Sequence, residues 1–153
     1  MRKPQLFRER SFIKRHSLSL VSAGILGLWI VLYIGSKPTT HVGSFFGNAV
    51  ADWSGVVVMV VATKYLYERG SVESRQPPHG HPLRPILRIL QEHSLTIFLV
   101  LTGIGWAFTY AAMDSESKWG QVVGNIVSEW TQILGLVLMT KRLIEPGSKE
   151  SKR

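Results

Sequence analysis

Long apolar stretches alternate with short polar segments along this sequence of 153 residues. Four stretches are long enough to be membrane spans, since a helix needs roughly 20 apolar residues to cross the hydrocarbon core of a bilayer. The stretches at residues 17–36 and 94–113 contain no charged residue, and those at 38–63 and 119–140 contain one acidic residue each. Because lipid cannot hydrogen-bond an exposed backbone, each span should be an α-helix. The chain is therefore predicted to be an all-α integral membrane protein.

The chain also repeats itself at an offset of 77 residues. Residues 16–76 align without a gap to residues 93–153, and 19 of the 61 aligned positions are identical. Each copy contains two spans, so both copies enter the membrane from the same side, as parallel repeats do about an axis along the membrane normal. We predict a four-helix bundle of two tandem hairpins with approximate two-fold symmetry. Its parts are a first repeat at 1–76 with spans near 17–36 and 43–64, a linker at 77–92, and a second repeat at 93–153 with spans near 94–113 and 119–141.

The 18 basic residues outnumber the 10 acidic ones, and their positions explain the excess. Six lie before the first span, five between the second and third spans, and five after the fourth, whereas the other two loops hold only Lys37 and Lys118. This distribution follows the positive-inside rule and predicts a multi-pass protein of the cell inner (plasma) membrane with both termini in the cytoplasm. The expected partners are the lipid bilayer and its anionic headgroups, and nucleic acid is not expected.

Two acidic residues, Asp52 and Glu129, interrupt the second and fourth spans within the matching phrases GNAVADWS and GNIVSEWT. Each lies twelve residues before a lysine, Lys64 or Lys141, that should mark the headgroups. At about 1.5 Å per residue this separation is about 18 Å, which places both carboxylates near the middle of a core about 30 Å thick. An ionised carboxylate at that depth costs at least about 2.5 kcal/mol. Both residues therefore need a physical explanation.

Polar and small residues accompany the two carboxylates on the same spans. On a helix, residues four apart share a face and residues eleven apart nearly return to it. The predicted ion or proton site consists of Asp52, Glu129, Asn48, Asn125, Thr63 and Thr140. A neighbouring row of small residues should let the helices approach closely. Its glycines are Gly43, Gly47, Gly55, Gly120 and Gly124.

No basic residue inside the predicted spans can pair with these carboxylates. One interpretation is that the carboxyls are protonated and hydrogen-bond the helices together, in a non-transporting membrane scaffold or assembly subunit. The other is that they hold a cation or a mobile proton, because ionisable residues inside a membrane commonly mark such paths. The sequence therefore predicts a small polytopic inner-membrane protein that passes a cation or proton, with the scaffold as the alternative. Either interpretation is compatible with a homo-oligomer.

Other candidates for chemistry are few. The sequence has no cysteine, which excludes disulfides and thiolate metal or redox sites. His79 and His81 have no carboxylate or thiol support for a metal site and should be solvated loop residues. His16 and His93 stand at matching helix ends, where a haem across the symmetry axis is one option, but the serine after each favours a helix start with a serine cap. Without a phosphate loop, a zinc motif or a nucleophile–base set, no enzyme activity, metal or cofactor is expected.

Two short segments outside the spans mix apolar with basic residues, at 6–15 and 86–91. Segments of this composition lie at the headgroups as interfacial helices or caps. The segment at 76–85, QPPHGHPLRP, is rich in proline and histidine and should break the chain between the repeats.

Each repeat closes on a similar phrase, RGSVESR at 69–75 and GSKESK at 147–152. In this phrase the chain resembles an uncharacterised family of small bacterial four-span membrane proteins built from two such units. The resemblance rests on the start Ser17 to Ser19 and on Trp53, Arg69, Gly70, Ser71, Glu73, Ser74, Arg75, Trp130, Gly147, Ser148, Glu150, Ser151 and Lys152. It implies a bacterial inner-membrane protein and assigns no activity.

Overall fold

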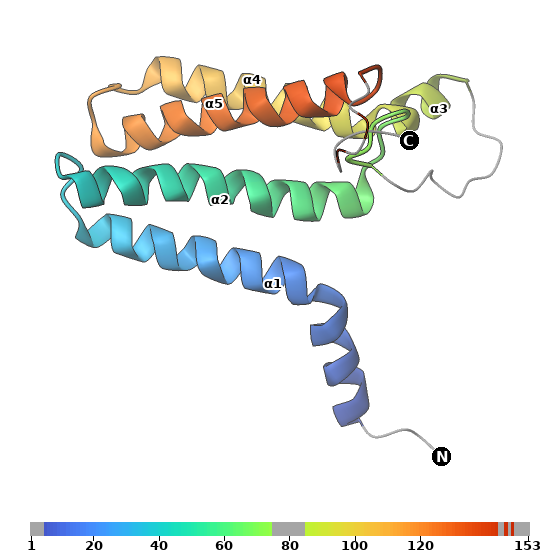
Figure 1. Ribbon diagram of the computed structural model, residues 1–153, viewed down its shortest axis with the longest axis horizontal. Coiled ribbons are helices and arrows are strands. Elements are labelled where there is room, and N and C mark those ends of the chain that lie inside the picture. The colour runs from blue at the N-terminus through green and yellow to red at the C-terminus, as the bar shows by residue number, and fades with distance from the viewer. Residues whose placement is uncertain (1–4, 75–84, 144–145, 147, 149–153) are drawn as a thin grey trace. The chain divides into compact units, whose positions relative to one another are not determined.

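The computed structural model describes residues 5–74, 85–143, 146 and 148, with side chains from residue 12 onwards (Figure 1). The regular elements in this part of the chain are α1 (Gln5–Gly35), α2 (His41–Tyr65), α3 (Pro85–Glu92), α4 (Ser94–Ala112) and α5 (Lys118–Met139). The predicted all-α class is confirmed. Helices α1, α2, α4 and α5 each contain a stretch long and apolar enough to cross a membrane, so the chain is a multi-pass membrane protein.

The chain divides into two compact units, Met1–Val60 and Val61–Arg153. The boundary falls inside α2, well before the repeat boundary predicted at residue 76. Residues 61–74 thus belong to the first repeat by sequence and to the second unit by their contacts. The end of the first repeat therefore packs within the second unit.

In the first unit, α1 and α2 form an antiparallel hairpin (Figure 1). Helix α1 is one continuous helix of 31 residues, so its basic start is not a separate short helix; the helix bends before its apolar part (Figure 1). Tyr33 is 1% exposed, and its ring covers Gly47 on α2. A Cβ at residue 47 would lie 3.0 Å from Tyr33 Cε2. Trp29 adds an edge-to-face contact with Phe45 at a centroid distance of 5.7 Å.

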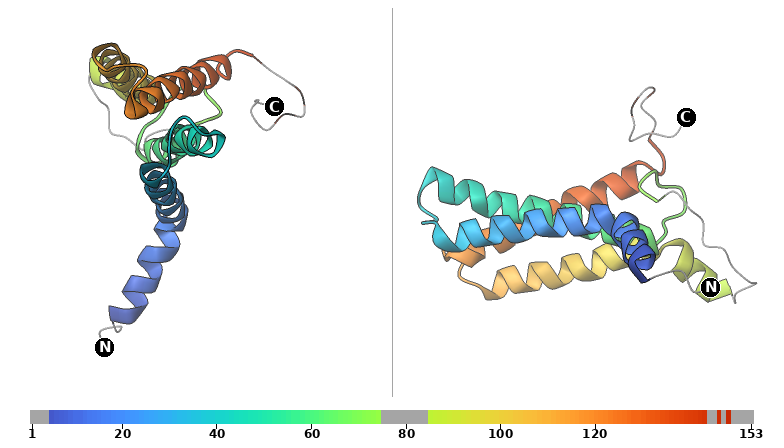
Figure 2. Two further views of the ribbon diagram at one scale, coloured as in Figure 1. Left: turned by 90° about the vertical axis from the view of Figure 1, so that its left-hand side faces the viewer. Right: turned by 90° about the horizontal axis from the view of Figure 1, so that it is seen from below.

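In the second unit, α4 and α5 form the corresponding hairpin and lie side by side (Figure 2). The two helices pack around the indole of Trp130. Trp130 Nε1 donates a 2.9 Å hydrogen bond to Thr102 Oγ1, its ring meets that of Trp106 at 6.0 Å in a T-shaped arrangement, and Gly103 leaves room for it. The contact therefore satisfies the indole N–H inside an apolar hairpin, where an unpaired donor would be costly.

The duplication extends to side-chain packing. Tyr110 covers Gly124 as Tyr33 covers Gly47, and a Cβ at residue 124 would again lie 3.0 Å from the tyrosine Cε2 atom. Small residues at such points let two helices approach closely. Gly55 on α2 is also buried.

The second and fourth spans, α2 and α5, also begin with the same capped turn. Thr40 Oγ1 accepts the N–H of Gly43 at 3.1 Å, and Ser117 Oγ accepts the N–H of Gly120 at 3.0 Å. A Cβ on either glycine would collide with a backbone carbonyl oxygen of the preceding turn. The threonine and the serine occupy the N-cap position, where such side chains are favoured.

We expect Gly124→Val to destabilise the protein, because the new side chain would meet the ring of Tyr110. Overpacking of this kind costs about 1–3 kcal/mol. Gly105→Val is the matched control, because it introduces the same residue into a helix at a position where nothing lies within 4 Å of a Cβ. Helix content followed during unfolding in SDS measures the difference. Equal losses of stability in the two variants would contradict the packing.

Candidate functional site

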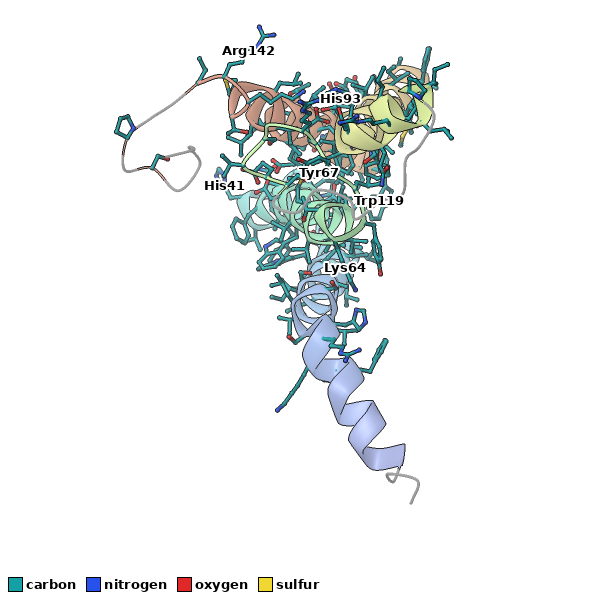
Figure 3. The ribbon with its side chains drawn as sticks, turned by 90° about the vertical axis from the view of Figure 1, so that its right-hand side faces the viewer. His41, Lys64, Tyr67, His93, Trp119 and Arg142 are labelled. Carbon is teal, nitrogen blue, oxygen red and sulfur yellow. The ribbon has the colours of Figure 1, made fainter. Side chains whose placement is uncertain are left out.

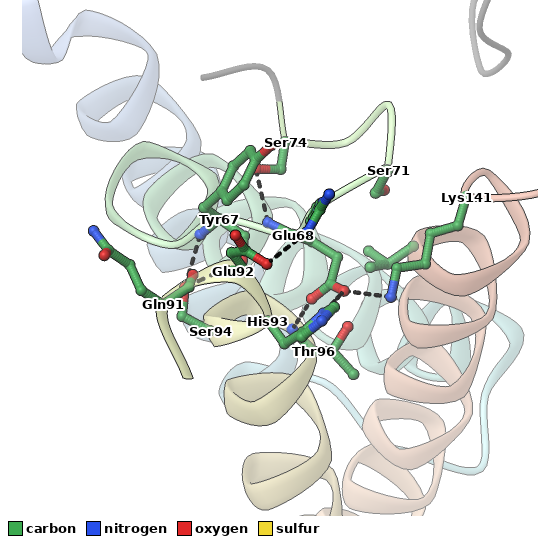
Figure 4. Close-up of polar contacts among 12 residues, drawn as sticks. Tyr67, Glu68, Ser71, Ser74, Gln91, Glu92, His93, Ser94, Thr96 and Lys141 are labelled. Atoms are coloured by element: carbon green, nitrogen blue, oxygen red, sulfur yellow. Dashed lines mark hydrogen bonds and ion pairs between the residues drawn. The ribbon is translucent and has the colours of Figure 1, made fainter. Parts of the chain in front are cut away.

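The segment after α2 lies against the junction between α3 and α4 and pairs with it through the backbone (Figure 4). The N–H of Arg69 donates to the carbonyl of Glu92 at 2.7 Å, and the N–H of Leu95 donates to the carbonyl of Tyr67 at 3.1 Å. The N–H of Tyr67 donates to Ser94 Oγ at 2.9 Å. The pairing satisfies backbone groups at an interhelical junction that lacks regular helical partners.

A tight turn follows this pairing. The N–H of Ser71 donates to the carbonyl of Glu68 at 3.2 Å, and Gly70 has a φ of 95°. A β-turn with positive φ at its third residue requires glycine there, because a side chain would be strained. The turn is extended by Ser74, whose Oγ accepts the N–H of Glu68 at 3.0 Å. The phrase ERGSVES thus folds back around the glutamate that begins it.

The side chain of Glu68 is fully buried, at 0% exposure. Its Oε1 lies 2.7 Å from Nδ1 of His93, between α3 and α4, and is also bound by Nζ of Lys141, which follows α5. Its Oε2 accepts the backbone N–H of Thr96 at 3.1 Å. Figure 4 shows these donors converging on one carboxylate. An ionised carboxylate only accepts hydrogen bonds, so His93 Nδ1 carries the proton in this contact.

Glu68 also caps α4 from outside the helix. His93 is the N-cap residue of α4, and its side chain makes no capping hydrogen bond. The prediction that Ser94 caps this helix is wrong: Ser94 is the first helical residue, and its hydroxyl donates to the carbonyl of Tyr67 at 3.1 Å. Glu68 instead accepts the free N–H of Thr96 in the first turn. The positive end of the helix dipole favours a negative charge at this position.

The pKa of Glu68 lies below its ordinary value. Burial acts in the opposite direction and raises the pKa, but hydrogen bonds from Lys141, Thr96 and His93 lower it more. The Thr96 hydroxyl is buried without a hydrogen-bond partner among the described residues, so we assign the bond from Thr96 to its backbone N–H. Glu68 is therefore ionised at neutral pH. Its counter-ion is Lys141, whose side chain is 23% exposed.

A second buried contact ties the same turn to α5. Ser71 Oγ and Thr140 Oγ1 lie 3.0 Å apart, and both residues are buried. Thr140 caps the C-terminal end of α5. The described part of the Glu68 site therefore joins the end of the first repeat to both spans of the second.

Of the predicted intramembrane site residues, Thr140 contacts Ser71 at the Glu68 site. The other five lie along α2 and α5. Asp52 and Asn48 are exposed on α2, and Glu129 and Asn125 are half-buried on α5. Thr63 is half-buried in the last turn of α2. The pairing of Asp52 with Glu129 stays a prediction. His79 and His81 lie outside the described residues, among which no group of three or more His, Asp or Glu is arranged to hold a metal ion.

Sequence reasoning missed Glu68 and the joint role of its partners, although the repeat contains the signal. Glu68 is identical to Glu145 at the offset of 77, His93 to His16, and Lys141 to Lys64. Glu68, His93 and Lys141 are therefore all duplicated in the sequence. Glu145 lies outside the described residues. The pattern does not single out this contact, because the histidines are also typical of helix starts and the lysines of the headgroup region.

Comparison of the chain with known protein families, with curated proteins and with solved structures finds no match.

We expect Glu68→Gln to destabilise the protein by about 1–3 kcal/mol, because it leaves the donors around a buried position without their charged acceptor. Glu116→Gln is the control: Glu116 is exposed in the turn between α4 and α5, and surface substitutions usually change stability by less than about 0.5 kcal/mol. Thermal unfolding in a mild detergent compares the two. A Glu68→Gln protein as stable as the control would contradict the site.

Stability should also fall in acid because of Glu68. Its pKa is lowered from 4.5 in the folded protein, so the unfolded chain binds the proton first as the pH falls. The contribution of Glu68 is complete above pH 4.5 and is lost as the pH drops through the lowered value. Glu68→Gln should therefore flatten the dependence of unfolding temperature on pH as the pH falls below 4.5. An unchanged pH dependence in this variant would exclude the assignment.

Proposed function

We propose that this protein is a non-enzymatic membrane scaffold or assembly subunit that resembles a family of small bacterial membrane proteins built from two hairpin repeats. The observation that supports it is the network around Glu68. Its donors among the described residues fasten the tail of the first repeat to α4 and α5. A network of this kind holds elements in a fixed arrangement.

The apolar surface of the spans agrees with this proposal. On α4, Leu101 is 65% exposed and Phe108 is 72% exposed. Such surface is stable only against lipid or other apolar helices, and transmembrane helices associate mainly by close packing. The protein thus has a wide face that is suited to the bilayer and to further subunits, including copies of itself. On the positive-inside distribution of its charges, its Glu68 site faces the cytoplasm.

A second candidate function is the passage of a proton or small cation. It is favoured by Asp52 and Glu129, which belong to the spans α2 and α5 and carry the cost of an acidic group within the membrane. A path through them would need both carboxylates to change protonation or to bind a cation during transport. The scaffold needs neither.

Reconstitution distinguishes the two functions. We expect proton and alkali-cation flux in proteoliposomes to match that of empty liposomes, both for the wild type and for Asp52→Asn/Glu129→Gln. The same double change should alter the oligomer size or unfolding temperature in detergent, because in a scaffold these carboxyls would hydrogen-bond the helices together. Light scattering coupled to size-exclusion chromatography measures the first of these effects.

Asp114→Asn/Glu116→Gln is the matched control, since it removes the same two charges from exposed positions between α4 and α5. Wild-type flux that falls several-fold in Asp52→Asn/Glu129→Gln and persists in this control would replace the scaffold by the transport function. Oligomer size and stability that respond equally to both double changes would leave no role for the intramembrane carboxylates in assembly.

A further inference from the structure

Helix α3 has an apolar face that no part of the described chain covers. All its residues from Pro85 to Leu90 are exposed, and Ile86 and Ile89 are 72% and 59% exposed. At 100° per residue, Ile86, Ile89 and Leu90 fall on one side of the helix and Arg88 and Glu92 on the other. The helix extends beyond the N-terminal end of α4, from which only His93 separates it (Figures 1 and 2). An amphipathic helix thus stands next to the end of a membrane span.

Two arginines bind the carboxylate of Glu92 on the polar side of α3: Arg88 from α3 itself and Arg69 from the segment after α2. Arg88 Nε donates to Glu92 Oε1 at 2.9 Å, and Arg69 Nη1 donates to Glu92 Oε2 at 3.0 Å. The backbone bond from Arg69 to Glu92 fixes the second arginine in place. The hydrogen bonds from Arg88 and Arg69 also hold the pKa of Glu92 below its ordinary value. The cluster therefore carries two positive charges and one negative charge at neutral pH.

The arginine side chains remain open to a further partner. Their exposures are 66% for Arg69 and 69% for Arg88, against 18% for Glu92. A guanidinium has five N–H donors in a planar fork that matches a phosphate group. One bond each to Glu92 orients the two forks and leaves most of their donors facing outwards.

We propose that α3 with Arg69 and Arg88 forms a binding site for an anionic phospholipid at the membrane surface. The phosphate accepts from the two guanidinium groups, and the acyl chains lie along Ile86, Ile89 and Leu90. The occupant follows from the combination of the two faces: a free anion would use the arginines and leave the apolar side chains in water. Continuity with the span α4 places the site at the boundary of the bilayer, where such a lipid is available.

Fluorescence tests the apolar half of the site in the full-length protein. The chain has no cysteine, so Ile89→Cys and Gln91→Cys can each be labelled with an environment-sensitive dye such as NBD. In vesicles of phosphatidylcholine and phosphatidylglycerol, we expect blue-shifted emission from residue 89 and water-like emission from residue 91. Water-like emission from both residues would show that lipid does not cover α3 and would overturn the proposal. So would a blue shift at residue 89 that persists when the detergent is exchanged for an amphipathic polymer without lipid.

Native mass spectrometry tests the headgroup half by counting phosphatidylglycerol and phosphatidylcholine bound from an equal mixture. One basic residue near an anionic surface contributes about 1 kcal/mol, so Arg69→Gln or Arg88→Gln should each lower the preference for phosphatidylglycerol about fivefold. Arg142→Gln is the control, because it removes one charge from an exposed arginine that points away from the α4–α5 hairpin (Figure 3). We expect it to change the preference less than twofold. Arg88→Lys, which keeps the charge, should retain an intermediate preference.

Three results would overturn the lipid site. The first is an unchanged preference in Arg69→Gln and Arg88→Gln proteins whose helix content matches the wild type. The second is an equal loss in Arg142→Gln, which would reduce the effect to net charge. The third is full competition by millimolar inorganic phosphate, which would identify the cluster as a site for a free anion.

Discussion

A carboxylate that is shut off from water is stable only when positive charge and hydrogen-bond donors surround it, and Glu68 imposes this requirement on the second unit. Its donors come from the junction before α4, from the first turn of α4 and from Lys141, two residues after α5. Displacing any one of these segments would leave a buried charge short of a partner. The site therefore couples segments that are distant in the sequence.

The same interaction changes how the duplication is understood. Tandem repeats joined by a linker are expected to fold as separate hairpins, each with its own tail. Here the tail of the first repeat, residues 61–74, belongs to the unit of the second. The end of the first repeat thus makes its buried polar contacts with α4 and α5, inside the second unit.

The polar residues of this protein fall into two groups with different physical problems. Glu68, His93 and Lys141 lie where spans end, so each can satisfy its hydrogen bonds within the chain while the exposed part of His93 and Lys141 remains near water. Asp52 and Glu129 lie within the spans α2 and α5, twelve residues from Lys64 and eleven from Lys118. The first group supports a fastening role directly.

The apolar and polar pattern by itself determined the helical class and the four spans, because an unbroken apolar stretch of about 20 residues satisfies its own backbone in a bilayer as a helix. Self-comparison of the sequence also determined the duplication, since identity at a constant offset needs no structure. Only the tertiary structure decided that Glu68 caps α4 and meets Lys141, because residues 68, 93 and 141 are brought together by how the chain folds back after α2. Local sequence patterns describe one helix at a time, whereas the hydrogen-bond partners of a buried charge come from segments that are distant in the sequence.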